Sequence, residues 1–299
     1  MKTDDFDYEL PEEFIAQSPL EPRDSSRLMV LERKTGKITH AVFRDIGQFL
    51  RPGDVLVLNE TRVIPARLYA HKIPTGGRAE ILLLRQRDSR TWEALVGGKG
   101  LRPGVHVQVE GGPEAEVIDS LNGARRIVQF EEPVENFINT AGHVPLPPYI
   151  HEPLEHPERY QTVYARQSGS AAAPTAGLHF TPQLLDSLSD QGVHITSVTL
   201  HVGLDTFAPV TEELPEEHQI HTEWCRLSPE TAAAINGARR QGGRVVAVGT
   251  TSVRTLESAA QEEGSAIAAY EGSTSLYILP GYTFQAVDMM VTNFHLPRS

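Results

Sequence analysis

The sequence predicts a mixed α/β fold: a Rossmann-like α/β domain interrupted by a small inserted antiparallel β-barrel. Apolar runs at 54–58, 193–202 and 244–248 each end in polar residues, as the strands of an α/β sheet do. Between Arg67 and Phe130, short strand-like pieces alternate with turn residues instead. We therefore expect a discontinuous α/β catalytic domain over 1–66 and 143–299, and the barrel over 67–142.

Length and composition indicate an ordinary globular protein. The chain has 299 residues, of which 39% are hydrophobic and 22% charged, enough for two domains. No apolar run approaches the roughly 20 residues of a membrane span, and the N-terminus lacks the layout of a signal peptide. Cys225 is the only cysteine, so an internal disulfide is excluded and a reducing cytoplasm is the expected location.

The charge is unevenly distributed. A net charge of −12 disfavours a general nucleic-acid binder. Residues 60–130, however, hold 11 Lys/Arg and 8 Asp/Glu, whereas the remainder holds 16 and 31. A mildly basic module on an acidic body is compatible with local phosphate contacts.

The N-terminal part predicts a hairpin and a buried strand. Residues 26–31 are expected to form a buried strand that pairs with 38–43, and 45–50 a short helix. The strand at 54–58 is followed at once by Asn59-Glu60-Thr61-Arg62, which is either a ligand loop or a connecting turn.

The inserted barrel is predicted from strands spaced about every ten residues. They are expected at 80–85, 91–97, 104–110, 114–120 and 125–130. The Pro- and Tyr-rich segment 142–166 is the return linker; its aromatic rings either stack on nucleic-acid bases or, as we favour, pack the loop down.

Two helices are predicted by their first residues. Thr181-Pro182 and Ser228-Pro229 each place an N-cap hydroxyl before a proline at the first helical position. A third helix is expected from about Val253, after Gly249-Thr250-Thr251-Ser252. Its N-terminus is either an anion site or a simple capped helix, and it lacks the lysine of a phosphate loop.

The small-residue stretch 168–180 is the most unusual segment. It permits close approach of a ligand to the backbone, although tight structural loops have the same composition. His179 is its only side chain that titrates near neutral pH, which makes it a natural acid or base.

Histidines recur in the polar segments that end apolar runs. Such segments tend to share one crevice, so they are candidates for one active site. They are His179, His201, His218, His221 and His295. The spacing of His218 and His221 is only a weak metal signal without a cysteine partner, so we expect no metal.

Long strings of residues resemble the S-adenosylmethionine:tRNA ribosyltransferase-isomerase family of queuosine biosynthesis, from residue 6 to the end. They are Asp7-Tyr8-Glu9-Leu10-Pro11, 59–67, 173–180, His201-Val202-Gly203-Leu204, His221-x-Glu223-Trp224, 249–257 and 292–297.

The resemblance implies an α/β domain with an inserted β-barrel and a tRNA-modifying transferase of the cytoplasm. The ribosyl part of S-adenosylmethionine is moved onto 7-aminomethyl-7-deazaguanine at the tRNA wobble position and isomerised, giving epoxyqueuosine while adenine and methionine leave. S-adenosylmethionine is then a consumed substrate, with no cofactor, no membrane partner and a monomeric enzyme expected.

This chemistry requires a base beside the sulfonium and a proton for the departing adenine. The expected catalytic residues are His179, His201, His221 and Glu223. The expected substrate-binding residues are Thr175, Gly177, Asp205, Thr206, Gly249, Thr250, Thr251, Arg254, Asn293 and His295. Arg62 and Arg67 are expected to contact tRNA phosphates.

Two departures from the family pattern suggest an alternative. Asp205 stands where the family usually has glycine, and the chain stops at Ser299 where family members continue for several dozen residues. The alternative function is a non-catalytic tRNA-binding relative, which would be inactive because the C-terminal segment of the family is missing. A different nucleoside-processing enzyme, which acts without tRNA, is the other class.

Overall fold

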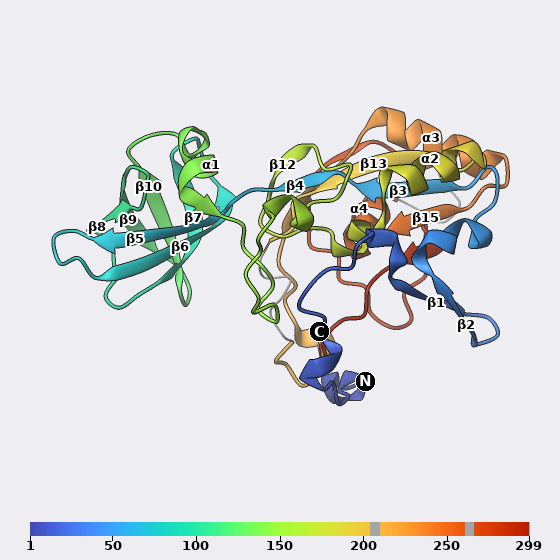
Figure 1. Cartoon of the computed structure of the whole chain (residues 1–299), viewed down its shortest axis with the longest axis horizontal. Coiled ribbons are helices and arrows are strands. Elements are labelled where there is room, and N and C mark those ends of the chain that lie inside the picture. The colour runs from blue at the N-terminus through green and yellow to red at the C-terminus, as the bar shows by residue number, and fades with distance from the viewer. Residues whose placement is uncertain (204–209, 261–265, 299) are drawn as a thin grey trace. The chain divides into compact units, whose positions relative to one another are not determined.

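A computed structural model describes residues 1–203, 210–260 and 266–298, and its contacts divide the chain into two compact units (Figure 1). Unit 1 comprises Met1–Arg62, Pro148–Gln167 and Ala173–Ser299. Unit 2 comprises Val63–Pro147 and Ser168–Ala172. A mixed α/β chain with an antiparallel barrel confirms the predicted fold class.

Unit 1 is built on a mixed sheet with the strand order β16-β14-β13-β3-β15-β17. The neighbours β13, β3, β15 and β17 run parallel, whereas β14 runs antiparallel to both of its neighbours, β13 and β16. The strands are β3 (Val55–Asn59), β13 (His194–Leu200), β14 (Glu223–Leu227), β15 (Val245–Val248), β16 (Tyr270–Thr274) and β17 (Met289–Val291).

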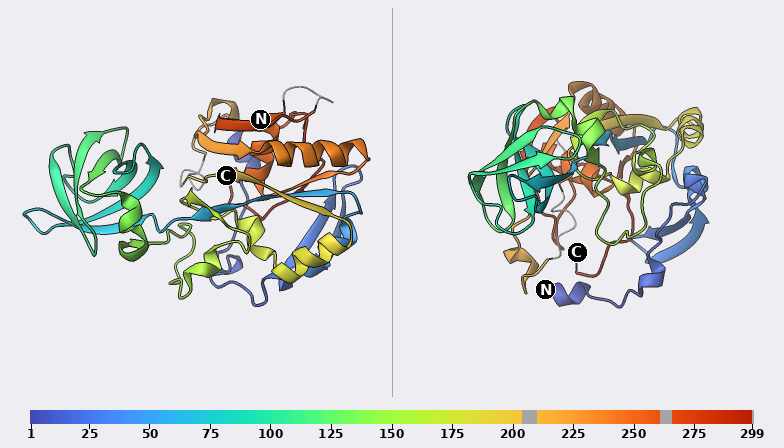
Figure 2. Two further views of the ribbon diagram at one scale, coloured as in Figure 1. Left: turned by 90° about the horizontal axis from the view of Figure 1, so that it is seen from above. Right: turned by 60° about the vertical axis from the view of Figure 1, so that its left-hand side comes forward.

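Helices cover both faces of this sheet (Figure 2). On one face, α2 (Pro182–Asp190) packs Leu184 and Leu188 against Leu56 and Val246. On the other face, α3 (Pro229–Arg240) and α4 (Thr250–Ala259) pack against strand residues that include Val57 and Val198. The central strands are buried on both faces, which explains their continuous apolar sequence.

The predicted N-caps are confirmed. The Thr181 hydroxyl accepts the Leu184 N–H at 3.1 Å, and the Ser228 hydroxyl accepts the Thr231 N–H at 3.2 Å. The third helix begins at Thr250, three residues before the predicted start, because Gly249 adopts φ +83° and turns the chain directly out of β15.

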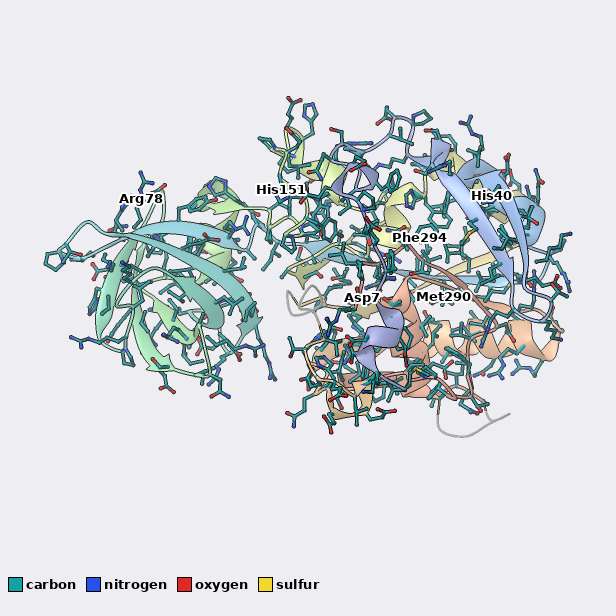
Figure 3. The ribbon with its side chains drawn as sticks, turned by 90° about the horizontal axis from the view of Figure 1, so that it is seen from below. Asp7, His40, Arg78, His151, Met290 and Phe294 are labelled. Atoms are coloured by element: carbon teal, nitrogen blue, oxygen red, sulfur yellow. The ribbon has the colours of Figure 1, made fainter. Side chains whose placement is uncertain are left out.

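The strand predicted at 26–31 is present but is not buried. β1 (Arg27–Glu32) and β2 (Lys37–Val42) pair only with each other. Leu31 is 55% exposed, and His40 lies on the same hairpin (Figure 3). The sequence run is apolar enough for a core strand, but only Leu28 packs partly against the core. The helix predicted at 45–50 is a 3₁₀ helix, Phe43–Phe49.

Unit 2 contains the closed antiparallel barrel. Its strands follow the order β5-β6-β7-β10-β9-β8, and β8 pairs back with β5. They are β5 (Arg67–Lys72), β6 (Arg78–Gln86), β7 (Thr91–Gly97), β8 (Val105–Val109), β9 (Glu114–Ser120) and β10 (Arg125–Phe130). All but β5 are close to predicted strands. The described residues add β11 (Gly142–His143) on β5 and the four-residue α1 (Ile138–Ala141).

The return segment is mostly irregular. β4 (Thr61–Val63) pairs with β12 (Gln167–Ser170), and 3₁₀ turns occur at Pro157–Tyr160 and Thr175–His179. Tyr160 is buried, as a loop-packing role requires, and burial raises its pKa.

Candidate active site

The parallel strands of unit 1 end at one edge of the sheet, and polar residues follow each of them. Asn59 ends β3, His201 follows β13, and Gly249 follows β15. Asn293 follows β17, and the next residue, Phe294, is 83% exposed (Figure 3). Parallel strands place their carboxyl ends together, which is where α/β proteins bind ligands.

Asn59 ties three of these segments together and was not predicted as a site residue. Its amide nitrogen donates to the Leu200 carbonyl at 3.0 Å and to the Thr251 hydroxyl at 3.2 Å. Its side-chain oxygen accepts the N–H groups of Leu200 and Thr61 at 3.0 and 3.2 Å. The sequence signal for Asn59 is an amide residue directly after an apolar run. In the structure this amide is fully buried, so its polar atoms need the partners described above.

The unit 1 part of the small-residue stretch, residues 173–180, packs tightly beside this edge. Ala173 and Ala176 are buried, and a Cβ built on Gly249 would lie 3.9 Å from the Cβ of Ala176. Thr175 begins the 3₁₀ turn that ends at His179. The stretch is therefore a close-packed loop at the strand ends, and its contact with a ligand stays a prediction.

Gly177 is required by packing. A Cβ at this position would lie 2.0 Å from the Tyr164 hydroxyl and 2.9 Å from Cγ2 of Thr162. We expect Gly177→Ala to lower the free energy of unfolding by about 1–3 kcal/mol, the usual cost of overpacking. In a Tyr164→Phe background the same change should cost less, because the nearest obstructing atom is gone; equal losses in urea denaturation would contradict this account.

His179 has both ring nitrogens engaged within unit 1. Nδ1 lies 3.0 Å from the Ser26 hydroxyl, and Nε2 lies 3.0 Å from the side-chain oxygen of Asn293. The ring also contacts Phe43, with the centroids 5.1 Å apart. The structure therefore brings together two predicted site residues, His179 and Asn293, that are far apart in the sequence, and adds Ser26.

His201 lies on the opposite side of β3 from that pair, beside Trp224. Its Nδ1 is 2.8 Å from Oγ1 of Thr61, and its ring stacks on Trp224 with centroids 5.1 Å apart and planes at 19°. Burial lowers the pKa of His201, so the ring is neutral at pH 7. Neither Thr61 nor Trp224 was predicted as a site residue; both stand beside predicted ones in the sequence.

His221, Glu223 and Arg254 form a second cluster. Glu223 accepts from the Arg254 guanidinium at 2.5 Å and from the Gly203 N–H at 2.9 Å, and His221 Nε2 lies 3.3 Å away. Burial disfavours the charged form of Glu223, yet its bonds to His221, Gly203 and Arg254 outweigh burial and hold its pKa below the ordinary value. The pairing explains how a carboxylate stays ionised with a side chain only 5% exposed.

These two clusters face opposite sides of the sheet. Side chains alternate along a strand, so Glu223 points to the same face as Leu227, which packs in the core with α3 and α4. Trp224 points to the other face. It is paired with His201 across the two strands, because the backbone N–H of His201 donates to the Trp224 carbonyl, so both side chains lie on this face. The predicted catalytic residues therefore lie at one end of the sheet but on two of its faces.

The other predicted residues are placed as follows. Thr250 and Thr251 begin α4, and the anion site at that N-terminus stays a prediction. Burial lowers the pKa of His295, whose backbone carbonyl accepts from Tyr8. His218 pairs with Glu212 at 2.9 Å, and the described residues contain no group of three or more metal-ligating side chains. Asp205 and Thr206 lie outside the described residues.

The two arginines expected at tRNA belong to different units. Arg62, in unit 1, pairs with Glu158, and Arg67, in unit 2, pairs with Glu80 at 2.9 Å. Each therefore has a carboxylate partner in the structure, and its contact with a tRNA phosphate stays a prediction. Among the described residues, no helix is sufficiently long and apolar to traverse a bilayer.

A mixed sheet with histidines, a buried carboxylate and amides at the edge where its parallel strands end defines an α/β enzyme that acts on a polar ligand. The family model described as "Queuosine biosynthesis protein" matches residues 3–299. The chain belongs to this queuosine biosynthesis protein family.

Two similar proteins are both named S-adenosylmethionine:tRNA ribosyltransferase-isomerase. That of Symbiobacterium thermophilum is 56% identical, with 100% of this chain and 89% of the relative covered. That of Desulfitobacterium hafniense is 54% identical with the same coverage. The crystal structure of S-adenosylmethionine tRNA ribosyltransferase from Thermotoga maritima is 38% identical, has a TM-score of 0.52, and is matched over 98% of this chain and 86% of that one.

Proposed function

We propose that this protein is an S-adenosylmethionine:tRNA ribosyltransferase-isomerase. It transfers the ribosyl part of S-adenosylmethionine to 7-aminomethyl-7-deazaguanine at the tRNA wobble position, isomerises it to epoxyqueuosine, and releases adenine and methionine. The observation that carries the proposal is 56% identity, over the whole chain, to a protein of that name.

The site supports proton transfer at the strand ends. The reaction removes a proton from the ribose carbon beside the sulfonium and returns one to the departing adenine. A neutral imidazole can take up the first proton, and the imidazolium that results can supply the second. S-adenosylmethionine is a consumed substrate, and no cofactor is required. We place the enzyme in the cytoplasm as a monomer that acts on tRNA.

The test is adenine release from S-adenosylmethionine, with and without tRNA that carries the 7-aminomethyl-7-deazaguanine base. Release that depends on this tRNA supports the proposal. Binding of the tRNA without release would favour the non-catalytic alternative. Release without tRNA would replace the proposal with a different nucleoside-processing reaction.

His179 provides a first residue-level test. We expect His179→Ala to lower kcat much more than it weakens S-adenosylmethionine binding, because the ring joins the 173–180 loop to the Asn293 segment. Ser26→Ala removes only one of the two ring contacts and should have a smaller effect. Full activity of His179→Ala would exclude the residue from catalysis.

A further inference from the structure

The proton position on His201 decides what this residue can offer a substrate. A neutral imidazole carries one N–H and one lone pair, on different nitrogens. With the proton on Nδ1, Nε2 is a base; with the proton on Nε2, the ring is a hydrogen-bond donor there. The only side-chain hydrogen bond of His201 among the described residues joins Nδ1 to the Thr61 hydroxyl.

The surroundings of Thr61 favour one arrangement. Its hydroxyl lies 3.4 Å from the backbone carbonyl of Gln167, which accepts and never donates. Thr61 has a single hydroxyl proton, so donation to this carbonyl leaves Oγ1 to accept the Nδ1–H of His201. The hydroxyl is held in place because Thr61 is 1% exposed and its N–H donates to the fully buried Asn59.

The other ring nitrogen is left for a ligand. Within the described part of the chain, Nε2 of His201 has no hydrogen-bond partner, whereas both nitrogens of His179 have one. The stack on Trp224 fixes the plane of the His201 ring, and the ring is only partly buried. His201 thus has an oriented nitrogen, without a partner among the residues that the structure describes, at the end of the sheet where the parallel strands terminate.

We propose that Thr61 is a positioning residue that keeps the proton of His201 on Nδ1 and thereby makes Nε2 the base of the reaction. The inference rests on the proposed function for the identity of the reaction. Nε2 takes the proton from the carbon beside the sulfonium, so that a C–H bond breaks and an N–H bond forms. The electron pair stays on that carbon, next to the positive sulfur, and the imidazolium keeps its Nδ1–H bond to Thr61.

Thr61→Val and Thr61→Ser form a matched pair for the kinetic test. Valine keeps the shape but removes the hydroxyl, so we expect kcat to fall about tenfold to a hundredfold, part of the ~10²–10⁴ that general base catalysis contributes, with KM for S-adenosylmethionine unchanged. Serine keeps the hydroxyl and should restore kcat. Wild-type kcat in Thr61→Val, or a change in KM alone in both variants, would overturn the proposal.

A second readout needs no turnover. The ¹⁵N NMR signals of the His201 ring, assigned by their loss in His201→Gln, distinguish the protonated nitrogen from the one with a lone pair. We expect Nδ1 to be protonated in the wild type and the proton to redistribute in Thr61→Val. A wild-type ring protonated on Nε2 would overturn the proposal. If the wild type released no adenine, the proposed function would fail while the tautomer remained measurable.

Discussion

Replacing His201 with glutamine should lower kcat for adenine release by a factor of about 10²–10⁴, the range that a general base contributes. KM for S-adenosylmethionine should change little, because glutamine keeps a polar side chain but cannot take up a proton at neutral pH. The comparison is made by steady-state kinetics with saturating tRNA. Among the described residues, His201 is the histidine of the candidate site that stacks on an aromatic ring and has a ring nitrogen without a hydrogen-bond partner.

His194→Gln is the matched control for this variant. His194 is exposed and begins the same strand, β13, at the end far from the site. It should retain wild-type kcat. A His201→Gln enzyme as active as His194→Gln would remove His201 from the mechanism.

The pH dependence of the same reaction follows from the pKa of His201. Burial lowers this pKa below the ordinary 6.5, so the base form predominates at and above that pH. We expect kcat/KM, which reports the pKa values of the free enzyme, to be level above about pH 6.5 and to fall as the pH drops through the lowered pKa. The free energy of unfolding changes in the same sense. As the pH falls below 6.5, His201 is protonated in the unfolded chain before it is protonated in the folded one, so the folded state becomes less stable. An activity that rises in acid would contradict this assignment.

Glu223→Gln should destabilise the α/β unit by about 3–5 kcal/mol, the usual cost of removing one partner of a buried ion pair. The change leaves the Arg254 guanidinium, itself 12% exposed, without its carboxylate at 2.5 Å. Urea denaturation in a Trp92→Phe background measures the effect, because Trp224 is then the only tryptophan and it reports on unit 1.

Glu271→Gln is the matched control on the neighbouring strand. Glu271 pairs with Arg226 at 3.5 Å, and both side chains are more than half exposed, so the loss should be within about 1 kcal/mol. The contribution of Glu223 is present above about pH 4.5 and should be lost as the pH falls through its depressed pKa. Similar losses in the two variants would show that the Glu223–Arg254 pair does not stabilise the fold.

The sequence alone predicts the elements whose signals are local. The continuous apolar runs of β3 and β15 identify buried strands, and the hydroxyl–proline pairs at Thr181 and Ser228 identify helix starts. Whether a strand is buried depends on the rest of the fold and not on its own residues alone. β1 has the composition of a core strand but lies on an exposed hairpin. β14 was missed because Glu223 occupies a buried position and Trp224 an exposed one, which hides the apolar–polar alternation of a strand.

The candidate site also has features that the sequence determines and features that only the tertiary structure determines. The sequence by itself determined the family resemblance, the chemistry it implies and the histidines at strand ends, because residue type and order carry that information. Only the tertiary structure decided that His179 has both nitrogens engaged, that His201 bonds to Thr61 through one nitrogen while the other has no partner among the described residues, and that Glu223 is paired with Arg254. These properties depend on which side chains from distant segments meet, and the sheet register that brings them together is fixed by packing of the whole unit rather than by any local pattern.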